Sequence, residues 1–85
     1  MGFKITPHAT FELKRRKLDA DLILSILQNP QQKFEVRPGR WVYQSQVTDK
    51  TTQKTCLVRV FVDVDREIPE IVTAYKTTQI SKYWR

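Results

Sequence analysis

The fold is decided by the stretch Cys56-Leu57-Val58-Arg59-Val60-Phe61-Val62-Asp63-Val64, in which every second residue from Val58 onward is valine. Successive side chains of a β-strand point to opposite faces of a sheet, so the four valines share one face. The other face carries Leu57, Arg59, Phe61 and Asp63. We predict a strand over residues 56–64 whose valine face packs in the core and whose other face is partly exposed.

Three further strands are predicted around this one, at Lys33–Arg37, Trp41–Val47 and Glu70–Thr77. These segments alternate in polarity or are rich in β-branched and aromatic residues. Pro38-Gly39 marks a turn between the first two. Consecutive strands joined by short loops form an antiparallel meander. The run Phe3-Lys4-Ile5 also alternates and fits a short edge strand at the start of the chain.

Two helices are predicted ahead of the meander. Thr6 is a suitable N-cap for a helix from Pro7 to about Lys17, because proline fits the first helical position. Asp19 caps a second helix, which Asn29-Pro30 ends. The apolar stripe of this second helix comprises Leu22, Ile23, Ile26 and Leu27. The sequence therefore predicts the α+β class, with two N-terminal helices packed on one face of a four-stranded antiparallel sheet.

The length of 85 residues predicts a single domain over residues 1–85. The tail Gln79–Arg85 fits a short helical turn or an ordered extension. No apolar run approaches the length of a membrane span, and no secretory signal precedes the domain. Cys56 is the one cysteine, so an internal disulfide is excluded. A cytoplasmic protein without a membrane partner is the expectation.

The charge points to a polyanionic partner. Fifteen Lys and Arg against nine Asp and Glu give a net charge of +6, which favours nucleic acid or an acidic protein segment. Four of these cations form the run Lys14-Arg15-Arg16-Lys17. Cations also stabilise the carboxyl end of a helix, and that alternative explanation of the run stays open.

Metal and cofactor chemistry are not expected. His8 and Cys56 are the only histidine and cysteine, too few for the usual structural zinc site. Gly2 and Gly39 are the only glycines, so no glycine-rich phosphate loop exists. What remains is plain binding or metal-independent acid–base chemistry. RNA can be cleaved in this way, because its own 2′-hydroxyl attacks the adjacent phosphate once a base removes the proton.

His8 and Arg59 are the most informative candidates for such chemistry. Histidine titrates near neutral pH, as a general base should, and Arg16 lies two helical turns from His8 on the same face. A surface or capping role for His8 remains the alternative. Arg59 interrupts the apolar strand, so its cation is solvated, paired with an acid such as Glu70, or aimed at an anion.

Other candidates lie on the sheet. Thr73 and Tyr75 share one face of the last strand, where their hydroxyls can contact phosphate. Tyr43 can stack on an unpaired base, although aromatic residues of small domains are commonly core residues. Lys76 adds a cation for nucleic acid. Cys56 begins the valine-rich strand and fits a buried structural thiol.

A family resemblance joins these residues. Three parts of the chain resemble a bacterial family of small proteins of unknown function. They are the run His8-Ala9, Glu12-Leu13, Arg16 and Leu18, the helix that ends at Asn29-Pro30, and the final-strand segment Ile71-Val72-Thr73-Ala74-Tyr75. That family is grouped with the barnase/RelE-like (RelE/ParE-type) toxins, which are metal-independent ribonucleases paired with antitoxins. The resemblance covers roughly residues 5–77 and implies a RelE-like fold.

The resemblance also implies roles for individual residues. His8 matches the family histidine, Arg16 its second arginine, and Thr73 with Tyr75 its final-strand motif. Glu12 stands where the first arginine is usual, and Lys17 where glycine is usual. Glu12 therefore replaces a phosphate-binding cation, or it orients His8 or acts as the base itself.

Two functions are carried forward. The first is a toxin of a toxin–antitoxin pair, an endoribonuclease acting on RNA without a metal. Its expected catalytic residues are His8, Arg16, Arg59, Thr73 and Tyr75, and its expected RNA-binding residues are Lys14, Arg15, Lys17, Lys76 and Tyr43. The second is a non-catalytic basic module that binds nucleic acid or an acidic protein such as an antitoxin. Homodimerisation through an exposed sheet face or edge is a further expectation.

Overall fold

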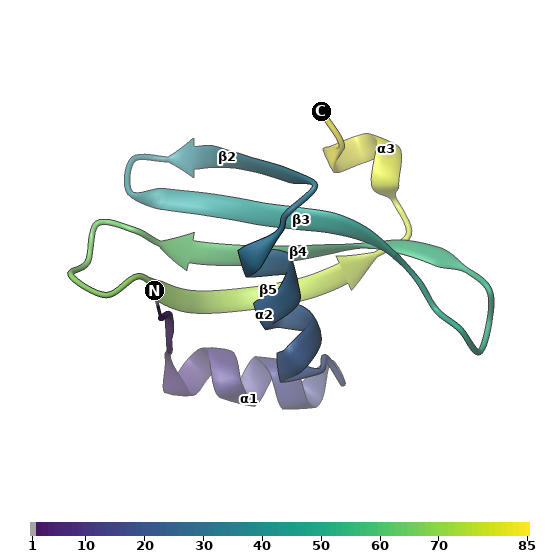
Figure 1. Ribbon diagram of the computed structural model, residues 1–85, viewed down its shortest axis with the longest axis horizontal. Helices are drawn as coiled ribbons and strands as arrows, with labels where there is room; N and C mark the ends of the chain where they lie inside the picture. Colours follow the sequence, from purple (N-terminus) through teal and green to yellow (C-terminus); the bar gives the residue numbers. More distant parts are fainter. Residues whose placement is uncertain (1) are drawn as a thin grey trace.

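The computed structural model describes residues 2–85 and shows helices and strands in the order β1, α1, α2, β2, β3, β4, β5, α3 (Figure 1). The strands are β1 (Lys4–Ile5), β2 (Gln32–Arg37), β3 (Arg40–Thr48), β4 (Thr55–Asp63) and β5 (Glu70–Thr77). The helices are α1 (Pro7–Arg15), α2 (Ala20–Gln28) and α3 (Ile80–Tyr83). The α+β class is confirmed, and α3 is the short helical turn expected in the tail.

The sheet has five strands in the order β1-β5-β4-β3-β2. Strands β2 to β5 form the predicted antiparallel meander, with Val60 of β4 opposite Tyr43 on one side and Ala74 on the other. The predicted sheet of four antiparallel strands is incomplete, because the short edge strand expected at the start of the chain is present as β1 and lies parallel to β5. A strand of two residues carries no sequence signal for its direction. In the structure, Thr6 N donates a hydrogen bond to Ile71 O at 3.2 Å and so holds the chain beside β5.

The helices begin where their capping residues predict. Thr6 Oγ1 accepts a hydrogen bond from Ala9 N at 3.1 Å, and the Asp19 carboxylate accepts one from Asp21 N at 2.9 Å. Helix α1 ends at Arg15, two residues earlier than predicted, because Lys17 takes a left-handed backbone with φ of 55°. The chain then turns toward α2.

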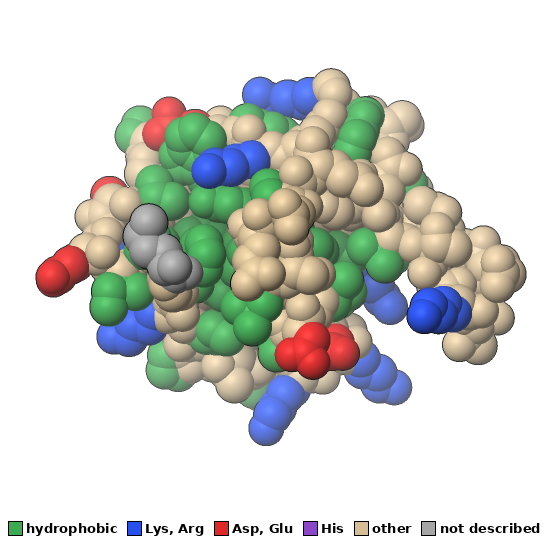
Figure 2. Space-filling view, viewed as in Figure 1, with side chains coloured by type: hydrophobic (Ala, Val, Ile, Leu, Met, Phe, Trp, Pro, Cys, Tyr) green, Lys and Arg blue, Asp and Glu red, His purple; other side chains and the backbone are tan. Residues whose placement is uncertain are grey.

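The core lies between the valine face of the sheet and the two helices. In Figure 1, α1 runs along β5 and α2 crosses in front of the sheet. Val58, Val60 and Val62 are almost completely buried against the apolar side chains of both helices. Figure 2 shows apolar side chains gathered on this side of the molecule, with Lys and Arg side chains toward its rim. Within residues 2–85, no helix combines the length and the apolar character needed to cross a membrane.

The opposite face of β4 is more buried than predicted. Leu57 is fully enclosed, and Arg59 and Asp63 are only 7% and 8% exposed. The cover over Arg59 includes the C-terminal segment, because Gln44 Nε2 donates to Tyr83 O at 3.1 Å and the Arg59 guanidinium lies 4.3 Å from the centre of the Tyr83 ring. The expectation of a partly exposed face is therefore wrong for these three residues, and over Arg59 the cover comes from the tail, which folds back onto the sheet.

Asp63 owes its burial to Arg40, its direct neighbour on β3. Arg40 Nε and Nη2 donate to the two carboxylate oxygens at 2.7 and 3.0 Å. These hydrogen bonds hold the pKa of Asp63 below its ordinary value, against the opposing effect of burial. The charged form of Asp63 is therefore favoured in the folded state.

Truncating the valine face should destabilise the protein. We expect Val60→Ala to lower the free energy of unfolding by about 2 kcal/mol, because the two lost methyl groups leave a cavity in a closed core. The matched control Val36→Ala changes a side chain that is 40% exposed and should cost less than about 0.5 kcal/mol. Urea unfolding measures both, and equal losses would contradict the assigned core.

Acid should weaken the hairpin that Asp63 and Arg40 hold together. Because the folded pKa is lowered, this stabilisation is present above the unfolded pKa of a carboxyl and is lost as pH falls through the folded value. Asp63→Asn should therefore unfold with a weaker dependence on pH in the acidic range than the wild type. Urea midpoints measured from neutral to acidic pH test this, with Asp65→Asn as the control at an exposed carboxylate of the adjoining turn.

Candidate functional site

The exposed side of α1 carries a row of charged side chains at helical spacing. His8 Nε2 lies 3.8 Å from Glu12 Oε1, and Arg16 Nη2 lies 3.4 Å from Glu12 Oε2. Arg15 Nη2 approaches the same carboxylate oxygen at 2.6 Å. The His8 side chain is 70% exposed, so it is open to a ligand from solvent. The four residues form one contiguous group, here called the α1 cluster: His8, Glu12, Arg15 and Arg16.

Glu12 is the centre of the α1 cluster. The hydrogen bond from Arg15 lowers the pKa of Glu12 below its ordinary value, and the positive charges of Arg15 and Arg16 act in the same direction against partial burial. The carboxylate is therefore ionised at neutral pH. In that form it can accept a proton or orient the imidazole of His8.

Arg16 joins the α1 cluster to the sheet. Its Nη1 donates to Ala74 O at 2.8 Å and to Thr73 Oγ1 at 3.3 Å. These contacts fasten α1 to β5, so Arg16 has a structural role there. About a third of its side chain remains exposed, which leaves it accessible to an anion.

Arg59 and Tyr75 form a second group, on the face of the sheet opposite the helices. Arg59 Nε donates to Gln44 Oε1 and Nη1 donates to Tyr75 OH, both at 2.8 Å. The rings of Phe61 and Tyr83 lie 5.2 and 4.3 Å from the guanidinium carbon. Neutral oxygens and aromatic faces therefore surround this cation, and no carboxylate of residues 2–85 forms an ion pair with it.

The five expected catalytic residues thus fall into two groups that meet on β5. Arg16 contacts Thr73, and Arg59 contacts Tyr75, two residues further along the same strand face. His8 belongs to the exposed group and Arg59 to the enclosed one. One open patch that includes both His8 and Arg59 is not present in this structure.

The expected RNA-binding residues are also divided. Lys14, Arg15 and Lys17 are exposed on and after α1. Tyr43 is 7% exposed and packs edge-on against Phe3, with ring centres 6.2 Å apart, so it is a core residue unavailable for base stacking. Lys76 is exposed near the end of β5, beside a cavity.

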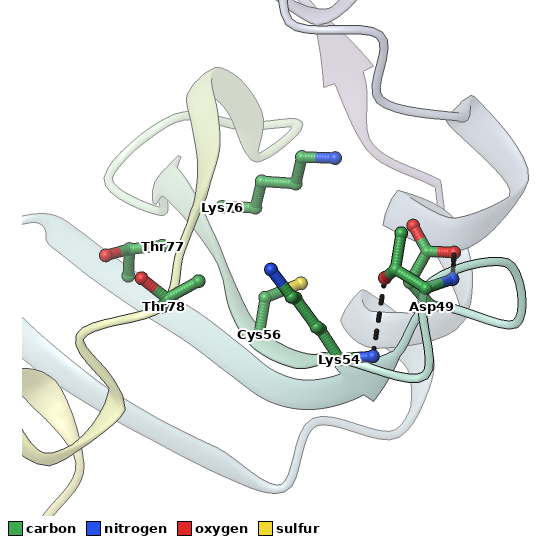
Figure 3. Close-up of a pocket in the computed structure, with 7 residues that line it drawn as sticks. Asp49, Lys54, Cys56, Lys76, Thr77 and Thr78 are labelled. Carbon is green, nitrogen blue, oxygen red and sulfur yellow. Dashed lines mark hydrogen bonds between the residues drawn. The ribbon is translucent and has the colours of Figure 1, made fainter.

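Sequence reasoning missed this cavity. It has a volume of about 420 Å³ and is lined by Asp49, Thr52, Lys54, Cys56, Lys76, Thr77 and Thr78. Figure 3 shows the side chains of Lys54 and Cys56 rising into the opening below Lys76. Two segments far apart in the chain, residues 49–56 and 76–78, supply the lining. The loop between β3 and β4 carried no motif that could have revealed the cavity.

Cys56 departs from its expected role as a buried thiol. Its side chain is half-buried and faces the cavity. Nearby, Asp49 accepts hydrogen bonds from Thr51 N and Thr52 N at 2.7 and 3.3 Å, and these bonds lower the pKa of Asp49. Across the described part of the chain, residues 2–85, no group of three or more His, Cys, Asp or Glu side chains could hold a metal ion.

Comparison with protein families finds a match over most of the chain. The model of a domain of unknown function, DUF4258, matches residues 5–78. No curated protein and no solved structure matches the chain. The motifs around His8 and Thr73 indicate a family of unknown function, and this part of the prediction is confirmed. Nothing in these comparisons links it to the RelE-type toxins.

Because Arg59 is enclosed, loss of the Tyr75 hydroxyl that accepts its hydrogen bond should destabilise the protein. Tyr75→Phe should lower the free energy of unfolding by about 1.5 kcal/mol, because it removes the acceptor for a charged donor and keeps the ring that stacks on Phe61. Tyr83→Phe, the matched control, loses a hydroxyl that makes no hydrogen bond within residues 2–85, and should cost less than about 0.5 kcal/mol. Urea unfolding measures both, and a neutral Tyr75→Phe would contradict the assigned hydrogen bond.

Proposed function

We propose that this chain, which belongs to the DUF4258 family of domains of unknown function, binds RNA and cleaves it without a metal ion, as RelE-type toxins do. The α1 cluster carries this proposal. It combines a solvent-exposed histidine, an ionised carboxylate and two arginines within reach of one another. The net charge of +6 favours the approach of the RNA backbone.

Each member of the α1 cluster fits one requirement of RNA cleavage. His8 takes the proton of the 2′-hydroxyl, whose oxygen then bonds to the adjacent phosphorus. Arg15 and Arg16 stabilise the negative charge that develops on the phosphate oxygens. The departing 5′-oxygen takes up a proton from water as its bond to phosphorus breaks. Glu12 holds the imidazole by its charge, which makes it a positioning residue.

The β5 residues support this site in different ways. Thr73 accepts a hydrogen bond from Arg16 and so helps to fix the guanidinium beside the phosphate. Arg59 is enclosed and does not touch the RNA in this proposal. Through Tyr75, it holds β5 in place behind Thr73.

A second candidate function is binding without turnover. The full enclosure of Arg59 favours it, because one of the expected phosphate-binding cations is absent from the exposed group. The exposed residues Lys14, Arg15 and Lys17 would then hold the backbone of a nucleic acid or an acidic protein such as an antitoxin. Such binding should weaken steeply as salt is raised.

An RNA cleavage assay tests the first function. Purified protein should cleave a labelled single-stranded RNA in the presence of a chelator, since no metal takes part. We expect His8→Ala to slow cleavage by roughly 100-fold or more, the usual contribution of a general base. The control Gln28→Ala truncates an exposed side chain on α2, away from the α1 cluster, and should leave the rate unchanged.

Other results lead to different conclusions. Equal cleavage by the wild type and His8→Ala, or no cleavage by either, would contradict the proposed ribonuclease activity. Salt-sensitive RNA binding without cleavage would then establish the second function. Loss of binding on replacement of both Arg15 and Lys14 by Gln would place that interaction on α1.

A further inference from the structure

The cavity beside Lys76 has the charge of an anion site. Lys54 and Lys76 both line it, and within residues 2–85 neither ammonium forms an ion pair with a carboxylate. Asp49 is the one acidic residue of the lining, and backbone amides of its own loop already occupy its Oδ1. Two cations without an ion pair therefore share one hollow with a single carboxylate, whose pKa those backbone hydrogen bonds lower and the charge of Lys76 helps to lower.

Hydroxyl groups complete the polar lining. Thr52, Thr77 and Thr78 all border the cavity. Thr52 Oγ1 accepts from Lys54 N at 3.3 Å, and Thr77 Oγ1 accepts from Gln79 N at 3.1 Å. Because these hydroxyls act as acceptors toward the backbone, their own protons remain available to a ligand. Ammonium and hydroxyl donors together match the oxygens of a phosphate group.

A smaller hollow of about 150 Å³ adjoins the first and differs in character. The two share Asp49, Cys56 and Lys76. The smaller one also has an apolar wall, made by Leu18, Leu22, Val47 and Val58. Lys17 and Asp19 complete its lining, and the Asp19 carboxylate already accepts a hydrogen bond from Asp21 N. The combined volume is in the range of sites that hold small organic ligands, which pair apolar walls with a few polar groups.

We propose that the two hollows bind a nucleotide, with its phosphate held by Lys54 and Lys76 and its less polar part on the wall that includes Leu22. None of the lining residues belongs to the α1 cluster, although Lys17 directly follows Arg16 in the chain. The inference does not require RNA cleavage. A free nucleotide and the terminal nucleotide of an RNA present the same group to this site.

Titration of isotope-labelled protein with adenosine monophosphate, followed by amide resonances, tests the proposal. The largest shifts should fall on residues 52–56 and 76–78. Adenosine, which lacks the phosphate, should bind the wild type at least about tenfold more weakly than adenosine monophosphate does. The variants Lys54→Gln and Lys76→Gln should bind adenosine monophosphate at least about tenfold more weakly than the wild type does. Lys50→Gln is the matched control, since it removes the same charge from the same loop at a residue outside the lining. It should change affinity by less than about twofold.

Further titrations separate the sources of the ligand. If an oligoribonucleotide with a terminal phosphate displaces adenosine monophosphate and the same oligomer without that phosphate does not, the site binds the ends of RNA. Displacement by neither oligomer, with intact binding of the free nucleotide, would assign it to small molecules. The absence of binding at millimolar nucleotide, or equal weakening by Lys50→Gln and Lys54→Gln, would overturn the proposal. His8→Ala should bind as the wild type does, whether or not it cleaves RNA.

Discussion

The enclosed guanidinium of Arg59 is the interaction on which the face of the sheet opposite the helices depends. Removing a cation from water is costly unless hydrogen bonds and favourable charge distributions replace its hydration. Gln44 from β3, Tyr75 from β5 and the Tyr83 ring from α3 provide that replacement. One side chain of the central strand therefore joins both neighbouring strands to the C-terminal segment, and the arrangement requires all of them in place.

This constraint also decides where chemistry can occur. With Arg59 covered, a ligand must be met by cations on other parts of the surface. Two groups of exposed cations are the α1 cluster around Glu12 and the pair Lys54 and Lys76 beside the cavity. Strand β5 is common to both, since Thr73 receives Arg16 and Lys76 borders the cavity.

Local signals in the sequence predicted most of the architecture. The alternating valines predict β4, and the caps Thr6 and Asp19 predict where α1 and α2 begin. Asn29-Pro30 predicts where α2 ends. Each signal depends on residues within a few positions of one another. The grouping of His8, Glu12 and Arg16 is of the same kind, because helical spacing brings them to one side whatever the rest of the chain does.

By itself, then, the sequence determined the α+β class, the meander and the row of charges on α1, because periodicity and capping act over one or two turns. Tertiary structure decided the parallel pairing of β1, the enclosure of Arg59 and the cavity beside Lys76. Each of these brings together segments distant along the chain, at positions where no repeating pattern specifies the neighbour. The burial of Tyr43 and the partial burial of Cys56 were decided in the same way, since a side chain's environment depends on what folds over it.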